Sequence, residues 1–413
     1  MKTIFASSVL AFANAAVHPF MAESNFICNL CQQQVEHAAA GRFDELAATY
    51  TIFPQLENMI ENSGLTAGNI DLTQPEQTCR ALGLCHEQSI AEYLVGEQPL
   101  NLEEIVEYVN SNPNSTWTAA APSKFADATR NSIRKMMGTV VDPDWKVTLK
   151  VKTSFPLMDV PSNFDARYTW HECEGVINHV RDQANCGSCW AHGTTEAFND
   201  RLCIATKGHF QTLLSTADTA ACCDGTQCFS FGCNGGQVGT PWTWFTRKGV
   251  VSGGDYGEGE LCYDYTMPMC AHHVVVPGLT DCSETPTIDP ICKAECQTNS
   301  AIDYASDKVL GVSSYSIKGV ENIKKEIFQN GSITGAFTVY EDFLTYSSGV
   351  YYHQTGASHG GHAIKVIGWG HESGLDYWLC VNSWNTNWGM NGTFKIKMGD
   401  CGIDDAMHAG LAM

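Results

Sequence analysis

The pattern of apolar and polar positions divides the chain into four sections, and the first is a short apolar run. Residues 1–16 carry one Lys, then apolar residues, then the small-residue pattern Ala13-Asn14-Ala15. This order is typical of a secretory signal peptide that is removed from the mature protein. The run is shorter than the roughly 20 residues that a bilayer-spanning helix requires, so we expect a soluble mature protein without a membrane anchor.

The second section, residues 24–95, has a helical pattern and carries cysteines close to its two ends. Cys28 and Cys31 lie near its start, and Cys79 and Cys85 near its end, in the stretch CRALGLC. The spacing and the LGLC ending resemble saposin-like domains, and this resemblance implies the disulfides Cys28–Cys85 and Cys31–Cys79. Saposins carry a third, central pair that is missing here. Lipid binding therefore stays open beside a structural or targeting role, while bridges are favoured over a zinc site in a secreted chain.

The third section, residues 96–159, begins with a predicted amphipathic helix and continues with a polar stretch. The helix rests on apolar residues at helical spacing and on Asn101 as a capping residue, with Glu104 three positions later. These apolar residues are Leu102, Ile105, Val106 and Val109. In the polar stretch Trp117 and Phe125 are isolated apolar anchors, which indicates a segment laid extended over another domain.

The fourth section, residues 160–413, is rich in glycine, aromatic residues and cysteine. One helix is expected directly after Cys189, followed mostly by short strands. The buried stripe of that helix would consist of Ala191, Thr195, Phe198 and Leu202. Helices first and strands afterwards predict an α+β fold, with a cleft between two halves.

Composition narrows the class of protein. Nineteen cysteines behind a predicted signal peptide point to an oxidising compartment and a disulfide framework, and the odd count leaves at least one free thiol. The formal charge of −21 excludes nucleic acid and anionic membranes as natural partners. An acidic lumen suits such a chain, because protonation of some carboxylates relieves their mutual repulsion.

The strongest local signal for chemistry surrounds Cys189. The stretch QANCGSCW runs from Gln183 to Trp190, so Cys189 would open the predicted helix. A thiol at a helix N-terminus faces the positive end of the helix dipole, which favours the nucleophilic thiolate. The alternative, a structural half-cystine, is disfavoured by this context.

A predicted hairpin supplies partners for the thiol. The runs HAIKVIGWG and LDYWLCVN flank a turn centred near Glu372, and this register places His362 opposite Asn382. A thiolate nucleophile needs an acid/base group and a group that orients it, and these two residues provide both. A zinc enzyme using His359 and His362 is the alternative, but a catalytic Glu at the usual spacing is lacking.

The expected roles follow from this arrangement. Cys189 attacks the peptide carbonyl, and His362 pairs with the thiolate and protonates the leaving amine. Asn382 orients the imidazole, and Trp384 shields their hydrogen bond from water. The side-chain amide of Gln183 and the backbone N–H of Cys189 form the oxyanion hole. Gly235 and Gly236 either mark a turn or offer an open backbone edge to an extended substrate; we favour the edge.

These motifs resemble the papain family of cysteine proteases, and cathepsin B in particular, across the whole fourth section. The resemblance to cathepsin B rests on Cys270-Ala271-His272-His273 within a cysteine-dense insertion. It implies a loop that closes one end of the cleft, with His272 and His273 holding the C-terminal carboxylate of the substrate. It further implies release of C-terminal dipeptides, and a tether from Asp182 to the loop through His272. Adjacent histidines on a surface or in an incidental metal site are the alternative.

The same resemblance implies six bridges in the fourth section. They are Cys173–Cys203, Cys186–Cys233, Cys222–Cys292, Cys223–Cys228, Cys262–Cys296 and Cys270–Cys282. Cys189, Cys380 and Cys401 then remain unpaired.

The chain departs from the family pattern at three places. His192 replaces the usual Phe one helical turn after Cys189, and no Arg follows the histidine pair, where Val274 and Val275 stand instead. Ala406 replaces the Glu with which cathepsin B admits Arg at the second subsite. We therefore expect a loosely held loop, more endopeptidase action, and a second subsite that takes hydrophobic side chains.

The resulting expectation is a monomeric cysteine endopeptidase with carboxydipeptidase activity, made as a zymogen. Its partners are polypeptide substrates and its own propeptide, which inhibits it, and neither cofactor nor metal is expected. It acts in a lysosome or vacuole, or outside the cell. The alternatives are a catalytically inactive papain-like binding protein and a lipid-binding saposin-like protein.

Overall fold

A computed structural model describes most of the chain from residue 96 onward. The described residues are 96, 98–121, 124–125, 128–141, 147, 149–271, 278, 280–281 and 290–412. The expected signal peptide and the expected saposin-like segment, with Cys28–Cys85 and Cys31–Cys79, lie outside them. So do His272 and His273 of the inserted loop.

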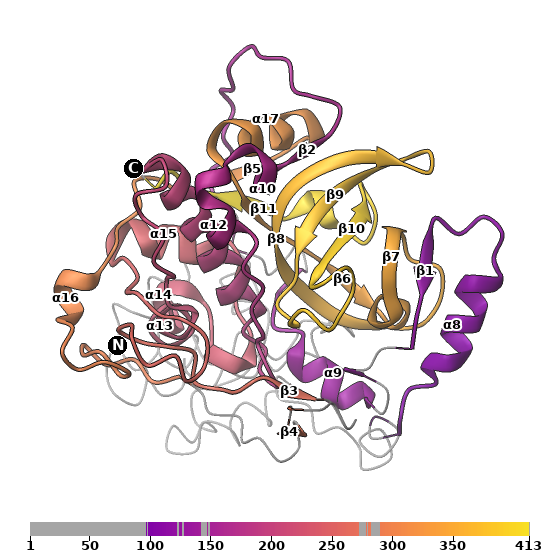
Figure 1. Cartoon of the computed structure of the whole chain (residues 1–413), viewed down its shortest axis with the longest axis horizontal. Coiled ribbons are helices and arrows are strands. Elements are labelled where there is room, and N and C mark those ends of the chain that lie inside the picture. Colours follow the sequence, from indigo (N-terminus) through magenta and orange to yellow (C-terminus); the bar gives the residue numbers. More distant parts are fainter. Residues whose placement is uncertain are drawn as a thin grey trace, which may run out of the picture.

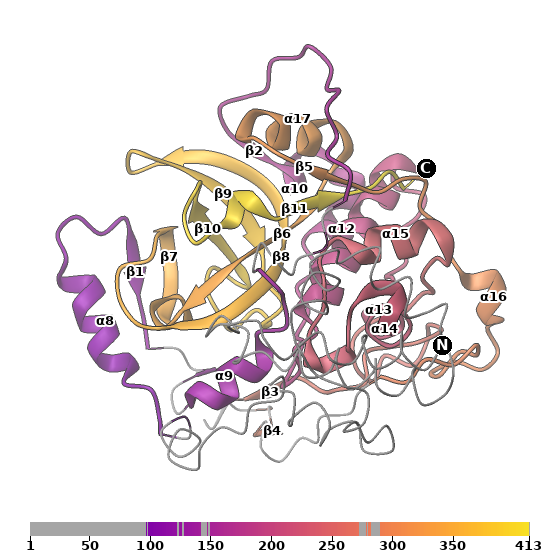
Figure 2. The ribbon, with the colours of Figure 1, turned by 180° about the vertical axis from the view of Figure 1, so that it is seen from behind.

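The fourth section, from residue 160 onward, has a helical half and a sheet half side by side (Figures 1 and 2). The longest helix, α12 (Cys189–Ala205), runs along the boundary between them. The other helices are α10 (Ala166–Thr169), α11 (Glu174–Ile177), α13 (Thr216–Cys222), α14 (Gly225–Cys228), α15 (Thr240–Arg247), α16 (Tyr304–Asp307) and α17 (Val320–Asn330). Short 3₁₀ turns are η2 (His171–Cys173), η3 (Gly232–Asn234), η4 (Glu341–Thr345) and η5 (Ile403–Asp405).

The described strands form a nine-stranded sheet in the order β1-β7-β10-β9-β8-β6-β11-β5, with β2 also on β8. The strands are β1 (Trp117–Ala119), β2 (Phe164–Asp165), β5 (Tyr315–Ile317), β6 (Ile333–Tyr340), β7 (Tyr346–Tyr351), β8 (Ser358–Glu372), β9 (Leu375–Val381), β10 (Thr393–Lys397) and β11 (Met407–Ala409). A separate parallel pair joins β3 (Cys270–Ala271) to β4 (Thr280–Asp281). The mixed α+β fold expected from the sequence is confirmed.

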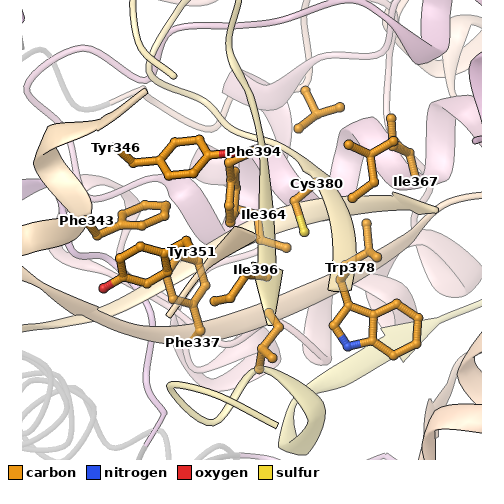
Figure 3. Close-up of a cluster of buried hydrophobic side chains, with 14 of the residues drawn as sticks. Phe337, Phe343, Tyr346, Tyr351, Ile364, Ile367, Trp378, Cys380, Phe394 and Ile396 are labelled. Atoms are coloured by element: carbon orange, nitrogen blue, oxygen red, sulfur yellow. The ribbon is translucent and has the colours of Figure 1, made fainter. Parts of the chain in front are cut away.

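The core of the sheet half is aromatic (Figure 3). Phe343 contacts Phe337 and Tyr351 edge-on, with ring centroids 5.0 and 4.9 Å apart. Such edge contacts add to the hydrophobic burial of large rings. They stiffen the strands from which the site described below is built.

Helix α12 is buried on all sides from Cys189 to Cys203, so the expected single apolar stripe is too narrow a description. One face packs on β8 so closely that a Cβ at Gly193 would lie 3.1 Å from the backbone of Ile364. Polar residues elsewhere on the helix are paired inside the protein. The Lys365 ammonium of β8 donates to Asp200 of α12 at 3.1 Å, and removing one partner of such a buried pair is strongly destabilising.

The expectation of a single convincing helix was wrong. Helices α13, α15 and α17 also form, and each has a local explanation. Helix α17 buries Ile323 and Ile327, four positions apart, and Pro241 lies in the first turn of α15, where its missing N–H costs no hydrogen bond.

The section before residue 160 contacts both halves, and it begins on the sheet half. Figures 1 and 2 show α8 (Leu102–Ser111) and β1 at its outer edge. Asn101 caps α8 by accepting from the Glu104 backbone N–H, and β1 extends the sheet by pairing with β7. Trp117 is buried on Tyr351, with ring centroids 5.1 Å apart.

Part of that section is helical and not extended, which corrects the expectation. Helix α9 (Arg130–Met136) begins at Thr129, whose side chain exchanges hydrogen bonds with Ser132 in a capping box. Its buried residues are Ile133 and Met136. With only two buried apolar positions over seven residues, α9 left little periodic signal.

Five of the bridges implied by the family resemblance are present. They are Cys173–Cys203, Cys186–Cys233, Cys222–Cys292, Cys223–Cys228 and Cys262–Cys296. Cys270 is also disulfide-bonded, and its expected partner Cys282 lies outside the described residues. Among the described cysteines, Cys189, Cys380 and Cys401 are free.

Candidate active site

The thiol of Cys189 lies at the start of α12, behind a stapled turn. The Cys186–Cys233 bridge and the hydrogen bond from Gly187 N to Cys233 O fix this turn. The Sγ atom is buried, and the backbone of Ala363 on β8 lies close enough to it to lower its pKa. The residue that follows His362 therefore contacts the thiol directly.

The imidazole of His362 is held by an amide. Its Nε2 lies 2.7 Å from Asn382 Oδ1, and the same oxygen accepts from Ser383 N at 2.8 Å. Because that oxygen is an acceptor, Nε2 carries the proton and donates it. Nδ1 has no hydrogen-bond partner among the described residues and is left as the basic nitrogen.

Trp384 covers this pair. Its ring stacks on His362 with centroids 4.7 Å apart and is fully buried. Phe125 of the section before residue 160 meets Trp384 edge-on at 5.2 Å. The hydrogen bond between imidazole and amide is thus sealed from water.

The hairpin register that led to this pair was wrong by two residues. The ladder pairs Lys365 with Val381 and closes at Glu372 and Leu375. A shift between Val366 and Gly368 inserts one residue into β8. His362 therefore lies beyond the β8–β9 ladder and meets Asn382 where the chain leaves β9.

The expected oxyanion-hole residue Gln183 is fully hydrogen-bonded. Its Nε2 donates to Met136 O at 2.8 Å and to Cys186 O at 2.7 Å, while its Oε1 accepts from Ser383 Oγ. The side-chain amide that we expected to donate to the substrate's oxygen therefore donates to a backbone carbonyl of α9 instead.

Residues that follow α9 cover the thiol itself. Thr139 Oγ1 lies 3.2 Å from Cys189 Sγ, and Thr139 N donates to Gly361 O. On the opposite side Gly236 N donates to Gly138 O at 2.8 Å, and Gly236 O accepts from Val140 N. Gly236 thus provides a backbone edge to an extended strand. Gly235, beside it, adopts a φ of 103°, which favours glycine.

Ala406 belongs to a buried apolar cluster. It clusters with Val238, Ala336 and Ala363, and Val141 packs against this cluster. The segment before residue 160 thus places an apolar side chain against the cluster to which Ala406 belongs.

Asp182 is bound by the prosegment, the part of the chain before residue 160. Both carboxylate oxygens accept from Lys124 Nζ, at 2.9 and 2.8 Å, and Asn385 and the Ala184 N–H donate as well. Its expected partner His272 lies outside the described residues. In this state, the carboxylate expected to tether the loop is held by Lys124.

Burial of the site favours the uncharged forms of the Cys189 thiol and the His362 imidazole. Burial raises the pKa of the Cys189 thiol, although hydrogen bonds from Thr139 and nearby backbone groups act in the opposite direction. Burial likewise lowers the pKa of His362 to about 4, although the Asn382 hydrogen bond raises it. A neutral thiol beside a neutral imidazole is a resting state, because the thiolate is the nucleophile.

His192 packs behind the thiol and takes part in a buried hydrogen-bond network there. Its ring lies edge-on to Tyr265 at 4.7 Å, and its Nδ1 lies 3.1 Å from Ser188 O. Ser188 Oγ contacts the Tyr265 hydroxyl, which donates to Gln183 O. Burial lowers the pKa of His192 to about 4, so the ring stays neutral.

Sequence reasoning missed three residues at this cleft. Arg130 of α9 binds Glu341, and His359 lies buried with its Nε2 3.9 Å from the same carboxylate. The one signal was the pair of histidines three apart on β8, interpreted above as a possible zinc site.

Among the described residues, no three His, Cys, Asp or Glu side chains gather as metal ligands. Nor does any helix in the described part have the length and apolarity to cross a membrane.

The family model for papain family cysteine proteases matches residues 160–411. The chain therefore belongs to the papain family of cysteine proteases.

Known relatives define the group within the family. Cathepsin B-like cysteine proteinase 6 of Caenorhabditis elegans is 38% identical over 321 residues, covering 76% of this chain and 83% of that protein. The gut-specific cysteine proteinase of the same species is 48% identical over 259 residues, covering 62% and 75%. The structure of procathepsin B S9 from Trypanosoma congolense is 30% identical with a TM-score of 0.65, covering 76% and 99%. The chain is a cathepsin B-like cysteine protease made as a zymogen, and its prosegment is an intramolecular inhibitor.

His359 predicts how acid affects the docked prosegment. Burial, with the charges of Arg134 and Arg130 on α9, lowers the pKa of His359 to about 3. Release of the prosegment removes the charges of Arg134 and Arg130, so the released state binds a proton at His359 more readily below its ordinary pKa of about 6.5. Docking is therefore strongest above that pH and weakens as the pH falls toward 3.

Amide hydrogen exchange in the inactive Cys189→Ala precursor measures this effect. The protection of the Thr139 and Val140 amides should fall below about pH 6.5, by up to about tenfold per pH unit. His359→Met should make the fall shallower, while His371→Met, at an exposed histidine of the β8–β9 hairpin, should not. Identical profiles for wild type and His359→Met would show that this histidine is not a sensor.

Proposed function

We propose that this zymogen matures to a cysteine endopeptidase with additional carboxydipeptidase activity. Cys189, His362, Asn382 and Gln183 are its catalytic residues. The observation that carries the proposal is the 2.7 Å hydrogen bond from His362 Nε2 to Asn382. It leaves Nδ1 basic, on the residue next to the Ala363 backbone that contacts Cys189 Sγ.

Peptide hydrolysis then proceeds in two steps. His362 Nδ1 takes the thiol proton, the thiolate adds to the substrate carbonyl, and the Gln183 amide and Cys189 N–H stabilise the oxyanion. Collapse breaks the C–N bond, and the imidazolium gives its proton to the leaving amine. Water, deprotonated by His362, then cleaves the thioester to release the acid and regenerate the thiol.

The prosegment supports this assignment because it covers the groups of the proposed site. Met136 O binds Gln183, Thr139 lies on the thiol, and Val141 packs against the apolar cluster that contains Ala406. Each contact covers an element needed for turnover. Access to substrate therefore requires that the segment leave, and we propose residues 96–159 as the propeptide and 160–413 as the peptidase domain.

The finer assignments concern the inserted loop, the cellular compartment and the segment before residue 96. His272 and His273 are proposed to hold a substrate's C-terminal carboxylate, with Asp182 as tether once Lys124 departs. Export through residues 1–16, action in an acidic compartment and a saposin-like fold for residues 24–95 complete the proposal. The acidic composition and the disulfides support the first two of these, and the LGLC cysteine pattern supports the third.

Active-site labelling distinguishes a protease from an inactive papain-like binding protein. Acidification of the wild-type precursor should release the propeptide and permit stoichiometric labelling by an epoxysuccinyl inhibitor. Cys189→Ala should abolish labelling, while Cys380→Ala, at another buried free thiol, should preserve both processing and labelling. A wild-type protein that remains unlabelled after acid treatment would contradict the proposal.

The apolar cluster that contains Ala406 predicts specificity at the second residue before the scissile bond. Fluorogenic Phe-Arg substrates should be cleaved at least about tenfold faster than Arg-Arg substrates, because Ala406 offers no carboxylate to balance a buried guanidinium. Ala406→Glu should raise the Arg-Arg rate selectively. Comparable wild-type rates on the two substrates would refute this role of Ala406.

A further inference from the structure

One contact between the prosegment and the peptidase domain lies outside the catalytic machinery. Arg130 Nε and Nη2 each lie 3.0 Å from the same carboxylate oxygen of Glu341. The Glu341 side chain is 11% exposed, and that of Arg130 is 41% exposed. Glu341 is thus a carboxylate at the bottom of a partly open site that an arginine fills.

Glu341 lies close to the cleft because of the strand pairing. Phe337 of β6 faces His362 of β8, and Tyr340 faces Ser358. Glu341 follows Phe337 by four residues, roughly 13 Å of extended strand. That distance is within reach of the first few residues of an extended peptide bound at the thiol.

The course of the prosegment shows on which side of the scissile bond Glu341 lies. The chain passes from Arg130, over Gln183 and the thiol, to Val141 at the apolar cluster that contains Ala406. Since Ala406 is proposed to contact a side chain before the scissile bond, the opposite end of the cleft receives residues after it. Glu341 and Arg130 are at this opposite, leaving-group end.

The site around Glu341 has room for a side chain once the prosegment leaves. A cavity of about 470 Å³ adjoins the pair. It is lined by Gln98, Pro99, Leu100, Asn101, Glu104, Ile105, Tyr108 and Arg130 of the prosegment, and by Glu341, Thr355 and Gly356 of the peptidase domain. Departure of the prosegment removes most of this wall and leaves the last three residues facing the solvent.

Departure of Arg130 also removes the main counterion. Among the described residues, the ion-pair partners of Glu341 are Arg130 and His359, the latter at 3.9 Å. Neither ring nitrogen of His359 has a hydrogen-bond partner in the described part of the chain. A neutral His359 does not balance the carboxylate, which is left able to attract a cation.

We propose that Glu341 is a specificity-determining residue of the mature enzyme, and that it binds a basic side chain of the substrate on the leaving-group side. Arg130 is the internal stand-in for that side chain. Arginine is preferred over lysine, because two guanidinium N–H groups converge on one carboxylate oxygen, whereas an ammonium meets it as a single point charge. The inference rests on the proposed peptidase function and adds a substrate class to it.

Acid should weaken this preference. The charged groups that face His359 from neighbouring elements are Arg130 and Arg134 of α9 and Glu341 of η4. In the mature enzyme only Glu341 remains of these. A protonated His359 then neutralises the carboxylate in part and competes with a basic substrate.

Kinetics on internally quenched, C-terminally amidated peptides test the proposal in the mature enzyme. Each peptide keeps Phe at the second residue before the scissile bond and carries Arg, Lys, Ala or Glu at one of the three residues after it. At one of these positions kcat/KM should be about three- to fivefold higher for Arg than for Ala, as a partly exposed ion pair allows. The ratio should shrink as the pH falls through the titration of His359.

Variants identify the residue responsible. Glu341→Gln should bring the Arg-to-Ala ratio to about one, and Glu341→Lys should invert it in favour of Glu. The matched control is Glu372→Gln, which removes a carboxylate bound to Lys395 on the β8–β9 hairpin and should leave the ratio unchanged.

The outcomes separate this inference from the function on which it rests. Equal wild-type rates for Arg and Ala at all three positions, or a ratio that persists in Glu341→Gln, would overturn the inference while the peptidase assignment stands. Failure to cleave any of the peptides would overturn the peptidase assignment and the inference together.

Discussion

The close packing of α12 on β8 is the constraint on which the site depends. The thiol comes from the helical half and the imidazole from the sheet half, so neither half holds a complete site. Gly193 allows the helix backbone to approach Ile364, and the buried pair of Lys365 and Asp200 joins the two elements further along. This approach brings Cys189 against the Ala363 backbone, next to His362.

The prosegment inhibits because its own groups take up the hydrogen-bonding and apolar positions of the site. It supplies a carbonyl to Gln183 and a hydroxyl to the thiol. It also supplies an apolar side chain to the cluster that contains Ala406 and an ammonium group to Asp182. Exclusion of water by the same segment favours the neutral thiol and neutral imidazole. Blocked access and a resting charge state therefore have one physical cause.

Much of the site was predictable from the sequence because its signals are local. The CGSCW stretch places a thiol at a helix start, and two strand-like runs around a turn bring His362 near Asn382. The hairpin register failed by two residues because the turn lies at Ser373 and Gly374, beyond Glu372, which shifts the pairing by three residues, and the extra residue between Val366 and Gly368 takes one of these back. Helix α9 was missed since its two buried residues have meaning only against the cleft that they cover. No local sequence pattern predicts the association of Arg130, Glu341 and His359, because these residues come from three separate segments of the chain.

The central claim is that His362 makes Cys189 a thiolate once the prosegment is gone. The pH dependence of Cys189 alkylation by iodoacetamide, followed by mass spectrometry in the mature enzyme, tests it directly. Rapid alkylation of wild type well below the ordinary thiol pKa of about 8.5 is predicted, with His362→Ala reacting only as the pH approaches that value. A wild-type profile that coincides with that of His362→Ala would contradict the account.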